Sequence, residues 1–158
     1  MRKRSSYRPK PQHPNPVAWL MNGFKPVSQA GIVNVQIKNH QAIDALRKGI
    51  ADREDIDTII AALNIAEALQ RLGIGDEYRD EVREAQDALY AVSKRGIDRE
   101  YRFVLKAQEL TAINLGMEVH DAQIEVTAIH HMEDALDMVK AEIKNRKARV
   151  IMEKANET

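Results

Sequence analysis

The stretch DREDIDTIIAALNIAEALQRLG, residues 52–73, decides the fold. Its apolar residues recur every three or four positions, which is the spacing of one face of an α-helix. The stripe is wide enough to pack on several neighbours, and it comprises Ile56, Ile59, Ile60, Leu63, Ala66, Leu69 and Leu72. Asp52 can cap the first turn, and Gly73 follows the last one. We therefore predict an all-α helical bundle built around a central helix from Asp52 to Leu72.

The segments on both sides of this helix carry the same kind of signals for the start and the end of a helix. Asn39 is a plausible N-cap for a preceding helix, and Gly49 can end that helix, with Ile50 placed for the apolar contact that often follows such a glycine. A following helix is predicted from Tyr78 to Arg95 by its apolar spacing. Residues 32–38 alternate between apolar and polar side chains, which favours a short extended segment.

The longest predicted element covers residues 107–146, which contain no proline. A single helix of this length would be a rod of about 60 Å, so part of it should project, bend or pair with another chain. Its second half keeps mainly one apolar row, formed by Met132, Leu136, Val139 and Ile143. This row suits either a packing seam that completes the monomer core or a homodimer contact through a long C-terminal helix.

The N-terminal residues 1–31 form a proline-rich arm in our interpretation, and residues 32–158 form the helical domain. Prolines stand at positions 9, 11, 14, 16 and 26, so the arm should be mostly extended. Trp19 and Phe24 are too apolar to remain in water at low cost, so we expect them to contact the helical domain or a partner.

Charge is distributed unevenly along the chain although the overall net charge is zero, with 24 basic and 24 acidic residues. Seven basic residues and no acid precede Asp44, so that the remainder has a net charge of −7. A flexible basic arm with an aromatic residue is typical of nucleic-acid binding by phosphate neutralisation and base stacking. The candidate residues are Arg2, Lys3, Arg4, Tyr7, Arg8 and Lys10. A solubilising tail and a protein-binding arm are the alternatives.

An acidic run in the predicted helix after Gly75 suggests a second way of binding. It comprises Asp76, Glu77, Asp80, Glu81, Glu84 and Asp87. Asp80, Glu84 and Asp87 could engage a basic site on a partner protein, as an inhibitor that imitates nucleic-acid charge would do. A solvated helix face explains the same residues without a partner.

Catalytic and cofactor motifs are missing from the sequence. There is no cysteine, no serine in a nucleophile elbow and no glycine-rich phosphate loop. Residues 118–134 bring carboxylates and His120, His130 and His131 together, but their spacing fits no established metal motif. We therefore predict a protein that is not an enzyme and needs no cofactor or metal, with a metal-dependent enzyme as the weakest alternative.

Two segments of the chain echo each other at an offset of 50 residues. Residues 60–66 and 110–116 both place an asparagine, Asn64 and Asn114, among apolar residues. The echo suggests that two core helices use equivalent buried asparagines, which would have to form hydrogen bonds. Chance similarity between two helices rich in Ala, Leu and Ile is the alternative.

The sequence offers no segment for membrane insertion or secretion. No run approaches the roughly 20 apolar residues of a membrane span. The basic N-terminus lacks the apolar core and cleavage site of a signal peptide. Together with the missing cysteines, this favours a cytoplasmic protein.

Four strings carry a resemblance over nearly the whole chain: residues 1–11, MRKRSSYRPKP; residues 37–40, IKNH; residues 61–64, AALN; and residues 119–123, VHDAQ. On these strings the chain resembles a group of short uncharacterised proteins from phages and prophages of Gram-negative bacteria. The resemblance implies an accessory protein of a mobile element. Such a protein would either accompany nucleic acid or block a host system, including host defence, by binding it.

Overall fold

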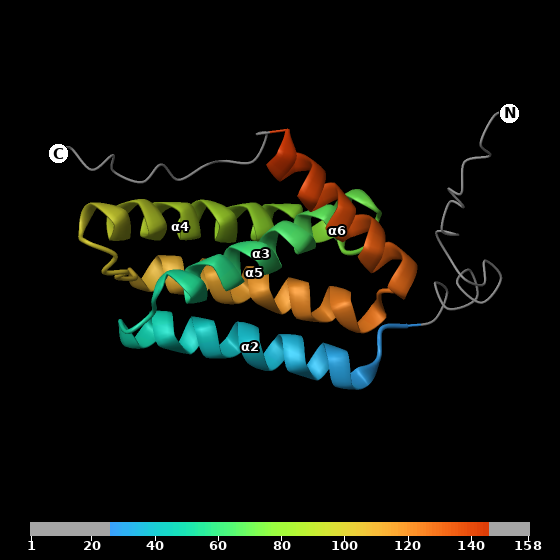
Figure 1. The fold of residues 1–158 in the computed structure, drawn as a ribbon, viewed down its shortest axis with the longest axis horizontal. Helices are drawn as coiled ribbons and strands as arrows, with labels where there is room; N and C mark the ends of the chain where they lie inside the picture. Colours follow the sequence, from blue (N-terminus) through green and yellow to red (C-terminus); the bar gives the residue numbers. More distant parts are fainter. Residues whose placement is uncertain (1–25, 146–158) are drawn as a thin grey trace, which may run out of the picture.

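The computed structural model describes residues 26–145 of the chain. Within this range the fold consists of five α-helices and one short 3₁₀-helix, which confirms the predicted all-α bundle (Figure 1). The elements are α2 (Gln29–Lys48), α3 (Arg53–Arg71), η1 (Asp76–Tyr78), α4 (Arg79–Asp98), α5 (Ala107–Val126) and α6 (Ile129–Lys144).

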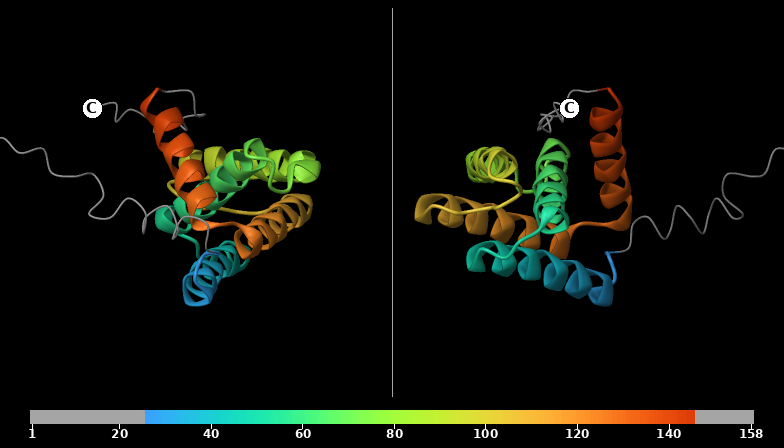
Figure 2. Two further views of the ribbon diagram at one scale, coloured as in Figure 1. Left: turned by 90° about the vertical axis from the view of Figure 1, so that its right-hand side faces the viewer. Right: turned by 60° about the vertical axis from the view of Figure 1, so that its left-hand side comes forward.

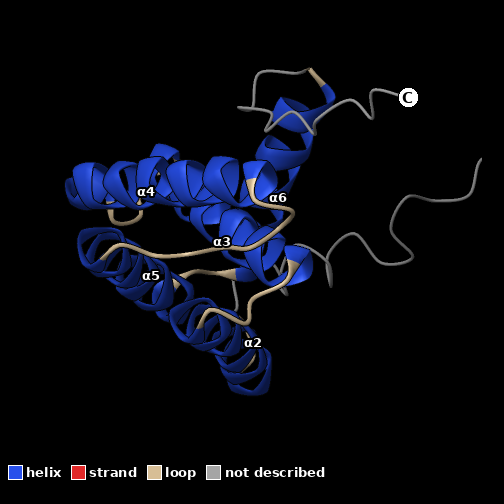
Figure 3. Cartoon of the chain, turned by 90° about the vertical axis from the view of Figure 1, so that its left-hand side faces the viewer, coloured by secondary structure: helices blue, strands red, loops and turns tan. Residues whose placement is uncertain are grey.

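Helix α3 is the central element, as its wide apolar stripe predicted. It packs against α2, α4, α5 and α6, which surround it when the bundle is viewed from the end (Figure 3). Ile59, Leu63 and Leu69 are completely buried on it. Asp52 caps its first turn by accepting a hydrogen bond from the Asp55 amide, and the Asp55 side chain accepts one from the Asp52 amide in return, both at 3.0 Å.

Helices α4 and α5 pack closely because a glycine stands at their crossing. A Cβ atom at Gly116 would lie 2.4 Å from the Cβ of Ala85, much closer than atoms can approach without strain. At the far end of the pair, Arg95 forms two hydrogen bonds of 2.7 and 2.6 Å with the carboxylate of Glu109. These bonds lower the pKa of Glu109, although its burial acts in the opposite direction. The contact at Gly116 and the Arg95–Glu109 ion pair therefore hold α4 and α5 together at two places along their length.

The prediction of one long C-terminal helix is wrong. The chain leaves helical geometry at Thr127 and Ala128, which are both extended, and α6 continues in a new direction (Figure 1). The Val27 amide donates to the Thr127 carbonyl at 3.4 Å, and Pro26 forms an isolated bridge with Ala128. The break lets Met132, Ala135 and Val139 reach the core cluster that includes Leu69. No glycine or proline marks this turn, and the helical spacing of apolar residues continues across it, so the sequence pattern did not indicate a break.

The predicted extended segment at residues 32–38 is also wrong, because α2 already begins at Gln29. Ser28 caps it, accepting from the Gly31 amide at 3.2 Å. The predicted N-cap, Asn39, lies in the middle of α2 and is buried, and its Nδ2 has no hydrogen-bond partner within residues 26–145. An alternation of apolar and polar residues over only seven positions can also occur in a helix. Here it falls on a part of α2 in which Val33 and Ile37 are exposed.

Two smaller predictions near these helices have mixed outcomes. Gly49 ends α2 in the left-handed conformation, with φ of 73°, as predicted. Ile50, which was expected to make an apolar contact after this turn, is 72% exposed. The expected pair of buried asparagines is wrong, since Asn64 is only half-buried and Asn114 is exposed.

We expect Gly116→Val to lower the free energy of unfolding by about 1–3 kcal/mol, because its side chain would force α4 and α5 apart. Ala122→Val, at an exposed position of the same helix, is the matched control and should cost at most about 0.5 kcal/mol through helix propensity. Urea denaturation of both variants measures the difference. Equal losses would contradict the close packing at Gly116.

Candidate functional site

A groove lies between α4 and α6 in the described part of the chain. Helix α3 forms its floor, with α4 on one side and α6 on the other (Figure 2, right). The volume is about 320 Å³, and the lining residues are Ile60, Leu63, Asn64, Glu67, Arg71, Arg83, Gln86, Asp87, Leu89, Tyr90, Val139, Glu142 and Ile143. The groove therefore combines aliphatic, aromatic and charged groups.

The groove exists because α6 packs on α3 and hardly meets α4. Its buried contact with α3 is made by Ala135 together with partly buried Met132, Met138 and Val139. The other edge of the same helix is open, leaving Ile143 61% exposed. An apolar wall is therefore available to a ligand without any rearrangement of the core.

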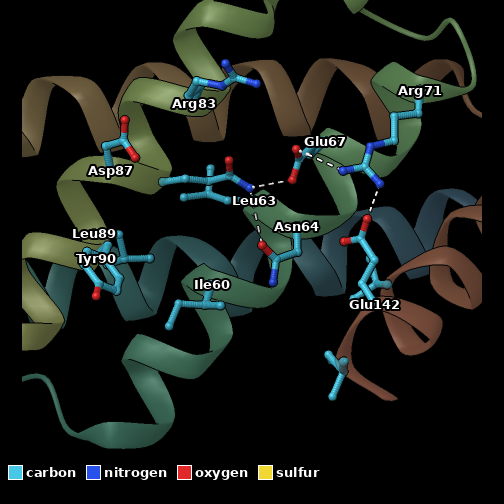
Figure 4. A pocket seen from close by; sticks show the side chains of 13 residues that line it. Ile60, Leu63, Asn64, Glu67, Arg71, Arg83, Asp87, Leu89, Tyr90 and Glu142 are labelled. Carbon is cyan, nitrogen blue, oxygen red and sulfur yellow. Dashed lines mark hydrogen bonds and ion pairs between the residues drawn. The ribbon is translucent and has the colours of Figure 1, made fainter. Parts of the chain in front are cut away.

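A chain of polar contacts crosses the floor (Figure 4). Arg71 donates to Glu142 of α6 and, at 3.2 Å, to Glu67 of its own helix. Gln86 of α4 donates to Glu67 at 3.1 Å and to Asn64 at 3.3 Å. Through these bonds all three helices are linked, and the groups that a ligand would meet are held in place.

Electrostatics at this end of the groove are dominated by Arg71. Its hydrogen bond to Glu142, assisted by the charge of Glu67, raises its pKa above the ordinary value despite partial burial. The groove as a whole carries Glu67, Asp87 and Glu142 against Arg71 and Arg83. Because three carboxylates stand against two guanidinium groups, the lining has a slight excess of negative charge.

The other end of the groove is apolar. Ile60 and Tyr90 face it from α3 and α4, above the buried Leu63 and Leu89 (Figure 4). The floor residues Ile60, Asn64, Glu67 and Arg71 follow one another at spacings of four, three and four, so they lie along one line of α3. That line is about 16 Å long at 1.5 Å per residue, which matches three turns of a bound helix.

Two buried glutamines hold the turn between α3 and α4. Gln70 donates to the carbonyls of Gly75 and Tyr78, at 3.1 and 3.0 Å. Gln123 of α5 donates to the carbonyls of Ala66 and Ile74, at 3.1 and 2.7 Å. Both side chains are almost fully buried, so their hydrogen bonds hold the turn firmly. Sequence reasoning did not find either residue.

A second polar cluster lies where α2 meets α5. His40 Nε2 is 2.6 Å from one oxygen of Asp121, and the Nδ1 of buried His120 is 3.5 Å from the other. Burial raises the pKa of Asp121, but the hydrogen bonds and charges of His120 and His40 outweigh it, and the pKa is lowered. The cluster links the two helices.

The predicted binding residues have different locations. The arm residues Arg2, Lys3, Arg4, Tyr7, Arg8 and Lys10, and also Trp19 and Phe24, lie outside the described residues. Asp80, Glu84 and Asp87 are exposed on α4, and only Asp87 of the three lines the groove. The apolar row predicted for the last helix contributes two lining residues, Val139 and Ile143.

The candidate metal ligands are divided between two helices by the break at Thr127. His130 Nε2 and a carboxylate oxygen of Asp134, four residues apart on α6, are 3.5 Å from each other. On α5, Asp121 contacts histidines, and Glu125 accepts from Gln36 at 3.1 Å. Among residues 26–145, no group of three or more histidine or acidic side chains is arranged to hold a metal ion.

Comparisons with family models, curated proteins and solved structures give no match to this chain. None of the helices between residues 26 and 145 combines the length and apolar character needed to cross a membrane.

We expect Asp121→Asn to lower the free energy of unfolding at pH 7 by about 1–3 kcal/mol, because both histidines lose a charged partner. The folded pKa of Asp121 lies below its ordinary value of 3.8, so the carboxylate stabilises fully above that value. Its contribution disappears as the pH falls through the folded pKa. The difference between wild type and variant should therefore narrow below pH 3.8.

Thermal and urea unfolding between pH 7 and about pH 3 would measure this difference. Glu118→Gln, an exposed carboxylate on the same helix, is the matched control and should change stability little at any pH. A difference for Asp121→Asn that stays constant at the acid end would contradict the role given to its charge.

Proposed function

We propose that this chain is a non-enzymatic binding protein that takes an amphipathic helical segment of a partner protein into the groove between α4 and α6. The observation that carries the proposal is the open apolar wall of α6, with Ile143 61% exposed beside a groove of about 320 Å³. Amphipathic helices bind grooves of this kind through apolar residues spaced three or four apart.

The chemistry of the lining indicates what such a segment should carry. Its apolar residues would lie against Ile60, Tyr90 and Val139, and one or two basic residues would complement the slight negative excess of the groove. The carboxylates of Glu67 and Glu142 are engaged by Arg71, and the lining contains no serine, threonine, cysteine or histidine. This composition favours binding over catalysis.

The resemblance to small phage and prophage proteins supports a biological setting for this activity. In that setting the partner would be a host or phage protein, and the chain would act as an adaptor or inhibitor, for example against host defence. Asp87, one of the acidic residues predicted to bind a partner, lines the groove and would contribute to the contact.

We expect Ile143→Lys and Tyr90→Ala, on opposite walls of the groove, each to weaken binding of the partner at least about tenfold, a loss of 1.4 kcal/mol. Affinity capture from a lysate of a Gram-negative host, with quantitative mass spectrometry, would measure recovery. Val126→Lys is the matched control, because Val126 is 75% exposed and lies outside the groove. A partner recovered equally by all variants would contradict the proposal.

Nucleic-acid binding through the N-terminal arm is the second candidate, and its support is the charge layout of the sequence. Seven basic residues precede the first acid, and five of them stand within residues 1–10. Binding by such an arm would release counterions, so it would weaken steeply as salt is added.

Replacing Arg2, Lys3, Arg4, Arg8 and Lys10 by alanine should abolish an electrophoretic shift of duplex or single-stranded nucleic acid. For the wild type, affinity should fall by about a hundredfold or more between 50 and 200 mM salt. Replacing the same number of basic residues on the helices, namely Arg47, Lys48, Arg79, Arg99 and Arg102, is the control. Binding that survives the arm replacement would rule this activity out.

A further inference from the structure

The outer row of α6 has exposed apolar residues that the core does not explain, and only one of them, Ile143, also lines the groove. Leu136 is 37% exposed and Ile143 is 61% exposed. Exposed charged residues stand between and beside them, so that Glu133, Leu136, Lys140 and Ile143 follow one line of the helix at spacings of three, four and three. An exposed apolar row bordered by charges is typical of a helix that pairs with another helix.

The charges on this row are divided between the two halves of α6. Glu133, Asp134 and Asp137 precede Val139 and form the acidic half in this sense, and Lys140 and Lys144 follow Val139 in the basic half. The remaining acid of the second half, Glu142, is neutralised by Arg71 within the same chain. The helix therefore presents a negative half and a positive half to solvent.

We propose that a second copy of this chain packs on this row, with the two α6 helices antiparallel about a twofold axis near Val139. An antiparallel pair brings the acidic half of each helix against the basic half of the other, which makes the surface complementary to itself, as a twofold dimer requires. It also brings Leu136 of each copy close to Ile143 of the other. A parallel pair would oppose like charges.

The dimer and the groove share Ile143, so a second copy on this row would compete with a partner for that side chain, whereas the charged residues Glu133, Asp137, Lys140 and Lys144 do not line the groove. Their exchange for the opposite charge should leave the fold intact, since all four are exposed. Circular dichroism would confirm the fold of every variant. Because the exchanged residues lie outside the groove, these variants keep every lining residue, and capture of the partner by the same variants tests the proposed function separately from the dimer.

Sedimentation equilibrium of the full chain at low salt tests the pairing. The wild type should be a dimer. The all-basic variant, Glu133→Lys with Asp137→Lys, and the all-acidic variant, Lys140→Glu with Lys144→Glu, should each dissociate at least tenfold more readily. An equimolar mixture of the two variants should form the dimer again, because each helix then meets one of opposite charge.

The four-residue exchange, which reverses both halves, should dimerise like the wild type. A monomeric wild type would overturn the proposal, as would two charge variants that dimerise as well as the wild type does. Rescue in the mixture distinguishes pairing through α6 from a dimer that uses another face, since only the first depends on these charges.

Discussion

The burial of α3 on several sides is the constraint on which the rest of the structure depends. Ile59 and Leu63 pack in the main core with α2, α4 and α5, and Ala66 joins a small cluster with Val82 and Val119. Leu69 packs with residues of α6. Each large aliphatic side chain buried in this way contributes about 1.5–3 kcal/mol, so α3 fixes the positions of all its neighbours.

The groove follows from this arrangement. Because α6 has α3 as its main support, one edge of α6 and one edge of α4 face each other across the exposed line of α3. The hydrogen bonds of Arg71 with Glu142 and of Gln86 with Glu67 tie α6 and α4 to α3, so they help to hold the walls of the groove in place. A preformed site of this kind avoids much of the entropy cost that a flexible surface pays on binding.

Much of the helical pattern could be predicted from the sequence. Asp52 and Gly49 act locally, through a cap and a left-handed turn, and local signals of this type can be identified without a structure. The break at Thr127 could not be identified, because it depends on contacts with Val27, a hundred residues earlier in the chain. Asn39 was misplaced for a similar reason, since its burial is decided by tertiary packing.

The groove itself was only partly accessible to sequence reasoning. The apolar row through Val139 and Ile143 could be read from its spacing, and Asp87 was found as part of an acidic run. Arg71, Gln86 and Glu142 look like ordinary surface residues in the sequence, and their roles arise only where three helices meet. Pairs of residues that vary together among relatives would be the signal for such contacts.

Photo-crosslinking in cells directly tests whether the groove between α4 and α6 binds another polypeptide. A photoreactive phenylalanine derivative in place of Tyr90 would line the groove. The same group in place of Val126 would be exposed to solvent outside the groove. We predict a discrete adduct with another polypeptide from position 90 and none from position 126. No adduct from position 90, or equal adducts from both positions, would contradict the assignment of the groove as a binding site.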